Sequence, residues 1–175
     1  MGRRVVVTGV AGSGKSTFSR ALSTRTGLPV IHLDVHFWTP GWVPTPENEW
    51  REKQRRLLSG DDWIVDGNEA TLDLRLERAD TVVFLDTPWW ICGRRACVRG
   101  LRKCPVGFEL PRGCDDSASR RLREEWCLAW RICRTRGSER ERDLGSLSQH
   151  REQVAVHALR SRRAAREFLY GLEPV

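Results

Sequence analysis

The segment 9–16 carries residues of the types and spacing that bind phosphate groups. It reads Gly-Val-Ala-Gly-Ser-Gly-Lys-Ser and matches the pattern G-x-x-x-x-G-K-[ST] at every fixed position. The glycines let the backbone curl so that successive N–H groups point inward at phosphate oxygens. Lys15 adds a positive charge near the β- and γ-phosphates, and the Ser16 hydroxyl is the expected Mg²⁺ ligand. The predicted contacts of a bound nucleotide are Gly9, Val10, Ala11, Gly12, Ser13, Gly14, Lys15, Ser16 and Thr17.

Three acidic residues, Asp34, Asp66 and Asp86, follow apolar runs that have the composition of buried strands. In open parallel sheets ligands bind beyond the carboxyl ends of the strands, so these acids are candidates for the site. Asp34 could accept the proton of an acceptor hydroxyl or hold the metal through water. Asp66 has the pattern of a Walker B acid and is expected to support the metal. Asp86 precedes Thr87 and Pro88, where its simplest role is to cap a helix, and capping is the alternative for all three.

Histidines and tryptophans gather around the second apolar run. We predict that His36 contacts the substrate and that His32 packs. Trp38, Trp42 and Trp50 either stack on a base or a sugar-like ring of the substrate or pack in the protein, and the sequence leaves both readings open.

The elements that must position these residues alternate between strands and helices. The predicted strands are 3–8, 29–33, 63–66, 81–86 and 154–159. The predicted helices are 15–26, 45–58, 71–78, one that begins near 88, 117–136 and 161–170. This alternation predicts an α/β fold in which a five-stranded parallel sheet carries helices on both faces. No linker divides the chain, so we expect one domain over residues 1–175.

The formal net charge of +7 is concentrated in one part of the 175-residue chain. Between Arg94 and Arg142 there are 14 basic and 7 acidic residues, whereas the rest of the chain has 16 of each. Such a segment suits nucleic acid, an acidic membrane surface or the phosphates of a small substrate. No DNA-reading module is recognisable, so nonspecific contact with nucleic acid is a possibility that the sequence does not favour.

The cysteines and the apolar runs bear on the compartment. The six cysteines form no C-x-x-C pair, and no run approaches the ~20 apolar residues of a transmembrane helix. With no signal-peptide pattern, this predicts a cytoplasmic protein with reduced thiols, no membrane partner and no zinc site. Trp126 and Trp130 lie four residues apart on a predicted helix and are expected to pack. Nothing in the sequence specifies the oligomeric state.

Several longer motifs carry a family resemblance. They are the segment 9–16, H-L-D-x-x-F-W-x-P-G-W-V-P-T-P-x-x-x-W over 32–50, W-I-V-D-G-N over 63–68 and T-L-D-L-R over 71–75. In these motifs the chain resembles the adenylate-kinase-like P-loop proteins that are called DNA topology modulation proteins. The resemblance implies a P-loop NTPase of the nucleoside-monophosphate-kinase-like fold. It further implies an acceptor-binding region at about 35–62 and a short Arg-rich lid at about 103–117.

The same resemblance implies roles for single residues. Asp34 would face the acceptor, and Asp66 would lie beside the metal. Gly93-Arg94-Arg95 is similar to the Gly-Arg-Arg that supplies a base-stacking and a phosphate-binding arginine in adenylate-kinase-like proteins. Arg95 and Arg99, on the helix that leads into the lid, are therefore candidate catalytic residues. Asn68, which closes the third motif, is a candidate substrate contact, as are Trp38 and Trp42.

These observations favour a Mg²⁺·ATP-dependent phosphotransferase. ATP is favoured over GTP because the chain lacks the N-K-x-D motif with which GTPases read the base. The partners are then ATP and a small acceptor, either a nucleotide or another hydroxylated or phosphorylated molecule. Lys15 would act on the phosphates of ATP, and Asp34 would act on the acceptor. The alternative is an ATP-binding regulator with weak hydrolysis that contacts DNA nonspecifically.

Overall fold

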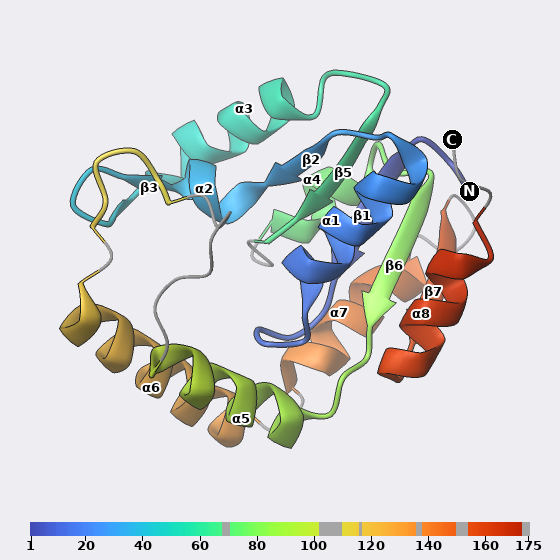
Figure 1. Cartoon of the computed structure of the whole chain (residues 1–175). Helices are drawn as coiled ribbons and strands as arrows, with labels where there is room; N and C mark the ends of the chain where they lie inside the picture. Colours follow the sequence, from blue (N-terminus) through green and yellow to red (C-terminus); the bar gives the residue numbers. More distant parts are fainter. Residues whose placement is uncertain (68–70, 102–109, 116, 136–137, 150–153, 173–175) are drawn as a thin grey trace.

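The computed structural model describes residues 1–67, 71–101, 110–115, 117–135, 138–149 and 154–172. Within these ranges the chain forms a five-stranded sheet of order β2-β5-β1-β6-β7, in which every neighbouring pair is parallel. The strands are β1 (Arg4–Thr8), β2 (Val30–His32), β5 (Trp63–Asp66), β6 (Thr81–Leu85) and β7 (Ala155–Leu159) (Figure 1). The predicted fold class, a five-stranded parallel α/β sheet, is confirmed.

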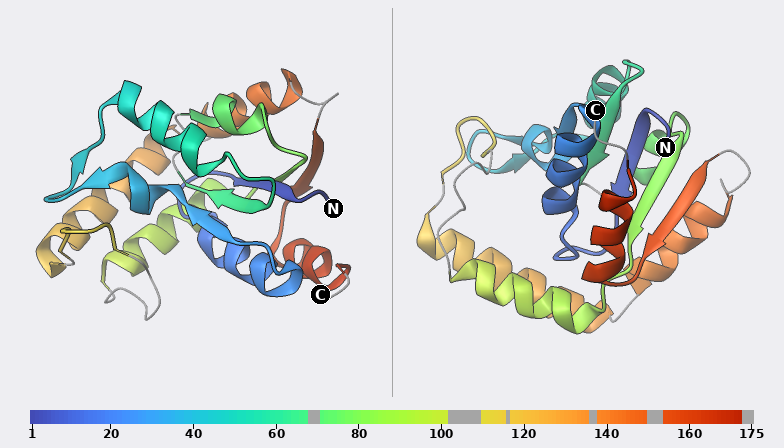
Figure 2. Two further views of the ribbon diagram at one scale, coloured as in Figure 1. Left: turned by 90° about the horizontal axis from the view of Figure 1, so that it is seen from above. Right: turned by 45° about the vertical axis from the view of Figure 1, so that its right-hand side comes forward.

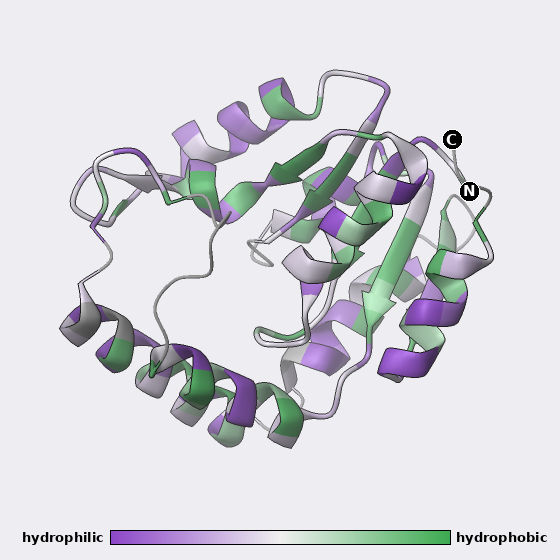
Figure 3. Cartoon of the chain, in the orientation of Figure 1, coloured by the Kyte–Doolittle hydropathy of each residue, from purple (hydrophilic) through white to green (hydrophobic). Residues whose placement is uncertain are grey.

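The centre of the sheet is β1, whose composition suits burial on both faces. Val5, Val6 and Val7 have no exposed surface, as expected for a β-branched run in a parallel sheet that is covered on both sides. Alternate residues of the strand join two different hydrophobic clusters, one on each face of the sheet. Figure 3 shows the strands as the most hydrophobic part of the fold, with more hydrophilic helices around them.

Helices cover both faces of the sheet, as predicted. The helices α1 (Lys15–Thr26) and α8 (Arg162–Tyr170) pack on one face. The helices α3 (Glu47–Leu57), α4 (Leu72–Leu76) and α7 (Ser138–Gln149) cover the other. The view from above in Figure 2 shows the sheet between these two groups.

Three elements differ from the predictions. The second strand ends at His32, and a short helix α2 (Leu33–Phe37) follows it, so Asp34 lies in a helix rather than at a strand end. The stretch predicted as a loop contains the antiparallel pair β3 (Trp38–Thr39) and β4 (Val43–Pro44). The helix α7 was not predicted, because its sequence is mostly polar and only tertiary packing of residues such as Leu147 holds it on the sheet.

The helices α5 (Trp89–Gly100) and α6 (Ala118–Thr135) lie against each other along one edge of the molecule (Figure 1). Small residues permit the close approach: a Cβ on Gly100 would lie 3.1 Å from Cβ of Glu125. The prediction that Trp126 and Trp130 pack is wrong, because they are 65% and 62% exposed. The face of α6 that packs on α5 instead buries smaller residues such as Ala129 and Ile132.

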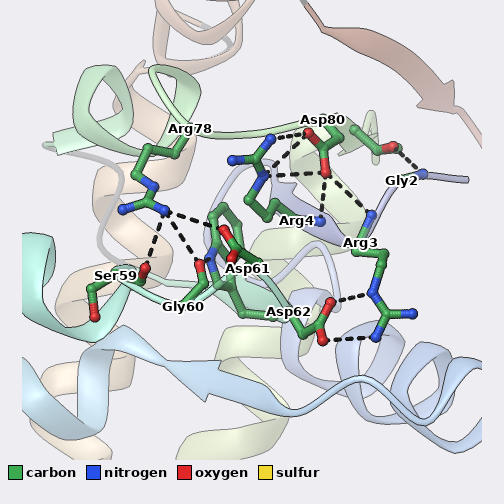
Figure 4. Close-up of polar contacts among 11 residues, drawn as sticks. Gly2, Arg3, Arg4, Ser59, Gly60, Asp61, Asp62, Arg78 and Asp80 are labelled. Atoms are coloured by element: carbon green, nitrogen blue, oxygen red, sulfur yellow. Dashed lines mark hydrogen bonds and ion pairs between the residues drawn. The ribbon is translucent and has the colours of Figure 1, made fainter.

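Ion pairs stabilise the end of the sheet where the strands begin (Figure 4). Arg4 Nη2 donates to Asp80 Oδ1 at 2.6 Å, and Asp80 also accepts from the backbone N–H groups of Arg3 and Arg4. Arg3 forms a second, two-pronged pair with Asp62. These charged residues form structural ion pairs. The candidate functional residues lie at the opposite end of the sheet, where the strands end.

Candidate functional site

The predicted phosphate-binding segment, residues 9–16, connects the end of β1 to the start of α1. Its backbone is closely enclosed by neighbouring chain segments. A Cβ on Gly9, which has φ +140°, would lie 2.6 Å from the carbonyl oxygen of Leu85. A Cβ on Gly12, with φ +82°, would lie 2.7 Å from that of Cys92. These two positions therefore require glycine for both conformation and space. Helix α1 begins where this loop ends, and the N-terminus of a helix binds anions well.

Two cationic side chains donate hydrogen bonds to carbonyl oxygens of the loop. Lys15 Nζ donates to the carbonyl oxygen of Gly9 at 2.6 Å. Arg95 Nη1, from α5, donates to the carbonyl oxygens of Gly12 at 3.1 Å and Ser13 at 2.8 Å. Burial lowers the pKa of the Arg95 guanidinium from its ordinary value. The predicted catalytic residues Lys15 and Arg95 therefore both lie at the phosphate-binding segment.

Asp66 ends β5, the strand next to β1, and is 1% exposed. Its Oδ1 lies 2.8 Å from Nδ1 of His32, so His32, which was expected to pack, also forms a hydrogen bond with this acid. Its Oδ2 is buried and has no hydrogen-bond partner among the residues that the structure describes. A buried carboxylate oxygen without a partner is costly in a protein interior unless a ligand satisfies it.

The carboxylate of Asp66 and the hydroxyl of Ser16 are oxygen ligands that suit Mg²⁺. The cation prefers oxygen ligands and takes few of them from the protein, leaving the rest to waters and substrate phosphates. Asp66 supplies a carboxylate, and Ser16 supplies a hydroxyl at the start of α1, a helix that packs against β5. Over the described ranges, no group of three or more His, Cys, Asp or Glu side chains could hold a metal.

Asp34 lies against Gly67, the residue that follows Asp66, although it stands in a helix and not at the predicted strand end. It stands in the first turn of α2 and is exposed. A Cβ on Gly67 would lie 2.9 Å from both Cγ and Oδ2 of Asp34, so the carboxylate rests over the residue that follows Asp66. The structure thus places the predicted acceptor acid against the residue that follows the predicted metal acid. Asn68, the neighbouring candidate substrate contact, lies outside the described residues.

The aromatic residues after Asp34 form a cluster. Its contacts show which of the three tryptophans packs in the core. Trp50 is 2% exposed and belongs to the core, with its ring 5.3 Å from that of Phe37. Trp38 and Trp42 are half-buried and meet edge to face at 5.8 Å. His36 is half-buried, and its carbonyl oxygen accepts a hydrogen bond from Lys53 at 2.6 Å.

The predicted acceptor region contacts the part of the predicted lid that the structure describes. Trp42 Nε1 donates to the carbonyl oxygen of Asp115 at 3.1 Å, and the N–H of Gly41 donates to Gly113 at 3.1 Å. The guanidinium of Arg120 lies over the Trp42 ring, 5.7 Å from its centroid. The hairpin β3–β4 therefore docks on this segment. Residues 103–109 and 116 of the predicted lid lie outside the described residues.

Arg99 and Asp86 have partners that the sequence did not predict. Arg99 forms a two-pronged ion pair with Glu125 of α6, at 2.5 and 2.7 Å, which ties it to helix packing rather than to the phosphate-binding segment. Asp86 caps no helix, since α5 has no side-chain cap. Asp86 instead receives two hydrogen bonds from Arg140 of α7, at 2.5 and 2.8 Å, and this pairing lowers the pKa of the carboxyl group.

Sequence reasoning missed two buried charged residues near the strand ends. Arg75, 1% exposed, donates from Nη1 to the carbonyl oxygen of Gly67 at 2.6 Å. Arg75 belongs to the T-L-D-L-R motif, but nothing in that motif indicates burial. Asp143 of α7, 3% exposed, accepts a 3.4 Å hydrogen bond from Thr8 at the end of β1. No sequence signal could have found Asp143 without first predicting α7.

Two further features complete the description. Across the described ranges, no helix has the length and apolar character needed to span a bilayer. One open surface pocket lies between α3 and α4, and none of its lining residues belongs to the candidate site; they are Arg55, Leu58, Leu74, Glu77 and Arg78.

Comparison with known proteins gives structural neighbours only. No protein-family model matches the chain, and no curated protein matches it. One structural neighbour is a gluconokinase from Sinorhizobium meliloti 1021, which is 21% identical over 73% of this chain and 91% of its own, with a TM-score of 0.41. Another is a sugar kinase from Janibacter sp. HTCC2649, 18% identical over 73% of this chain and 94% of its own, with a TM-score of 0.40. Neither supports the name of DNA topology modulation that the sequence resemblance suggested.

Proposed function

We propose that the chain is a Mg²⁺·ATP-dependent phosphotransferase that moves the γ-phosphoryl group to a small acceptor. The observation that carries the proposal is the position of Asp66. Its buried Oδ2 has no partner among the described residues, and it ends the strand beside the one that leads into the phosphate-binding segment. A nucleotide with bound Mg²⁺ would fit both features: the loop would bind its phosphates, and the unsatisfied carboxylate would bind the metal.

On the donor side, the backbone N–H groups of the phosphate-binding segment and the N-terminus of α1 bind the phosphates. Lys15 now holds the carbonyl oxygen of Gly9, and we propose that it exchanges this contact for the phosphates of ATP. Ser16 and Asp66 would hold Mg²⁺, which neutralises charge on the phosphate oxygens. Arg95 donates to two carbonyl oxygens of the loop, and we propose that it adds its positive charge to the same phosphate site.

On the acceptor side, Asp34 orients the acceptor hydroxyl or takes its proton. Its carboxylate is exposed and rests over Gly67, next to the metal acid, so it can meet a molecule that approaches from solvent. The acceptor class is a nucleotide or another small hydroxylated or phosphorylated molecule. Of the aromatic candidates, Trp38 and Trp42 remain half-buried and can contact such a molecule, whereas Trp50 belongs to the core.

The test compares Lys15→Ala with Arg20→Ala, an exposed position further along the same helix. A panel of metabolites is incubated with γ-labelled ATP, and transfer of label is measured together with the melting temperature. We expect Lys15→Ala to stay folded and to lose transfer by a factor of at least about 10², while Arg20→Ala matches the wild type. Full transfer by Lys15→Ala would disprove the proposal.

The same experiment distinguishes the alternative function. A nucleotide-dependent regulator would bind ATP, hydrolyse it slowly and transfer label to no acceptor in the panel. It would also bind random duplex DNA with an affinity that falls steeply as salt is raised. That combination of results would favour the regulator over the phosphotransferase.

A further inference from the structure

We infer that His32 is a positioning residue for Asp66, and that it fixes the carboxylate so that Oδ2 is presented to the metal. This inference rests on the proposed function and adds a residue to that site. It starts from one juxtaposition: a histidine at the end of β2 forms a hydrogen bond with one oxygen of a buried acid whose other oxygen has no partner among the described residues.

The pair follows from the register of the sheet. His32 and Asp66 are direct partners in the parallel pairing of β2 with β5, and each is the last residue of its strand. Their side chains therefore leave the same face of the sheet at the same level. The two side chains are 15% and 2% exposed, so water competes little with the bond between them. Because an ionised carboxylate only accepts hydrogen bonds, Nδ1 of His32 carries the hydrogen.

The bond determines which oxygen of Asp66 remains for a ligand. Strand β5 lies between β2 on one side and β1 on the other. His32, from the β2 side, holds Oδ1, so Oδ2 is the oxygen that is left without a partner among the described residues. Without the imidazole, the carboxylate could rotate about the Cβ–Cγ bond away from the orientation that His32 holds. A metal ligand must be held within about 0.5 Å of its working position, so this rotation matters.

Outer partners of this kind are important for metal sites in general. Loss of the group that orients a ligand typically reduces metal affinity or activity by about 10–100-fold. A purely structural hydrogen bond would instead change stability without changing how strongly Mg²⁺ promotes ATP binding. The ratio of ATP affinity with Mg²⁺ to ATP affinity without it therefore separates the two roles.

The experiment uses three variants of the full chain. In His32→Leu the donor is absent, while His32→Asn places an amide N–H near the position of Nδ1. The control is His157→Leu, which removes a half-buried histidine of β7 that contacts Phe168, on the opposite edge of the same sheet. ATP affinity is measured by calorimetry with and without Mg²⁺ at constant pH, and melting temperatures are recorded for each protein.

We expect His32→Leu to bind metal-free ATP within about twofold of wild type and to lose about tenfold of the gain that Mg²⁺ provides. His32→Asn should recover most of that gain, and His157→Leu should keep all of it. If His32→Leu keeps the full gain, or if folded His32→Asn loses as much as His32→Leu, the inference is wrong. If His32→Leu does not fold, His32→Gln replaces it, because its longer side chain places the amide away from Oδ1 and should behave like leucine.

Failure of this inference differs from failure of the proposed function. A wild-type protein that transfers phosphate and needs Mg²⁺, combined with a His32→Leu variant of unchanged metal dependence, overturns only the role of His32. A wild-type protein whose ATP affinity does not respond to Mg²⁺ overturns both.

Discussion

The carboxylate of Asp34 occupies the space where a side chain on Gly67 would be, with Cγ and Oδ2 each 2.9 Å from an ideal Cβ position. Gly67 also has φ +87°, a conformation that other residues adopt only with strain. Space and backbone conformation therefore both require glycine at the residue that follows Asp66. The placement of Asp34, the proposed acceptor acid, depends on this missing side chain.

Gly67→Ala should consequently displace Asp34 and destabilise the fold. We expect a loss of about 1–2 kcal/mol in the free energy of unfolding from the left-handed backbone, and a larger proportional loss of phosphotransfer than of ATP affinity. Urea unfolding, the transfer assay and calorimetry measure the three quantities. Gly60→Ala is the matched control, because a Cβ there meets nothing within 4 Å. Unchanged transfer in Gly67→Ala would show that the position of Asp34 is not critical.

Arg95 and Arg99 lie one helical turn apart on α5 but have different partners, the phosphate-binding segment and Glu125 respectively. Arg95→Gln should therefore weaken Mg²⁺·ATP binding by roughly tenfold, through loss of the loop contacts and of a charge near the phosphates. Arg99→Gln should leave the affinity within about twofold and lower the melting temperature instead. Calorimetry and thermal unfolding of both variants test this difference, and equal losses of affinity would contradict it.

The indole N–H of Trp42 connects the hairpin β3–β4 to residues 110–115, because it donates to the carbonyl oxygen of Asp115. Trp42→Phe removes this donor and keeps an aromatic ring. We expect faster hydrogen exchange in the hairpin β3–β4 and in residues 110–115, and a loss of stability of about 1 kcal/mol. Trp130→Phe, at an exposed indole on α6, is the control and should change neither quantity. Unchanged exchange in Trp42→Phe would mean that the indole bond does not hold the two regions together.

Local patterns predicted the features that depend on local chemistry. The valines of β1 and the glycines around Lys15 specify a buried strand followed by a phosphate-binding loop, whatever the rest of the chain does. The pairing of His32 with Asp66, which are 34 positions apart, depends on the register of two strands, and no local pattern contains that register. The same holds for Asp86, whose partner Arg140 lies on a helix that only tertiary packing stabilises.

The ion pair of Asp86 with Arg140 should make stability depend on pH in a defined direction. Arg140 lowers the pKa of Asp86 below its ordinary value of 3.8. A carboxyl group whose pKa is lowered by folding stabilises the protein above its unfolded pKa, and this contribution is lost as the pH falls through the folded pKa. The side chain of Asp86 is 12% exposed, so solvent screens the pair less than it would a surface pair.

Arg140→Met should therefore lower the free energy of unfolding by about 1–2 kcal/mol at pH 7, and the gap to wild type should shrink as the pH falls below about 4. Urea unfolding at pH 7, 5 and 3 measures the gap. Arg142→Met, an exposed position on the same helix, should lose little at any pH. A gap for Arg140→Met that stays constant down to pH 3 would show that the arginine acts through packing of its side chain rather than through the charge of Asp86.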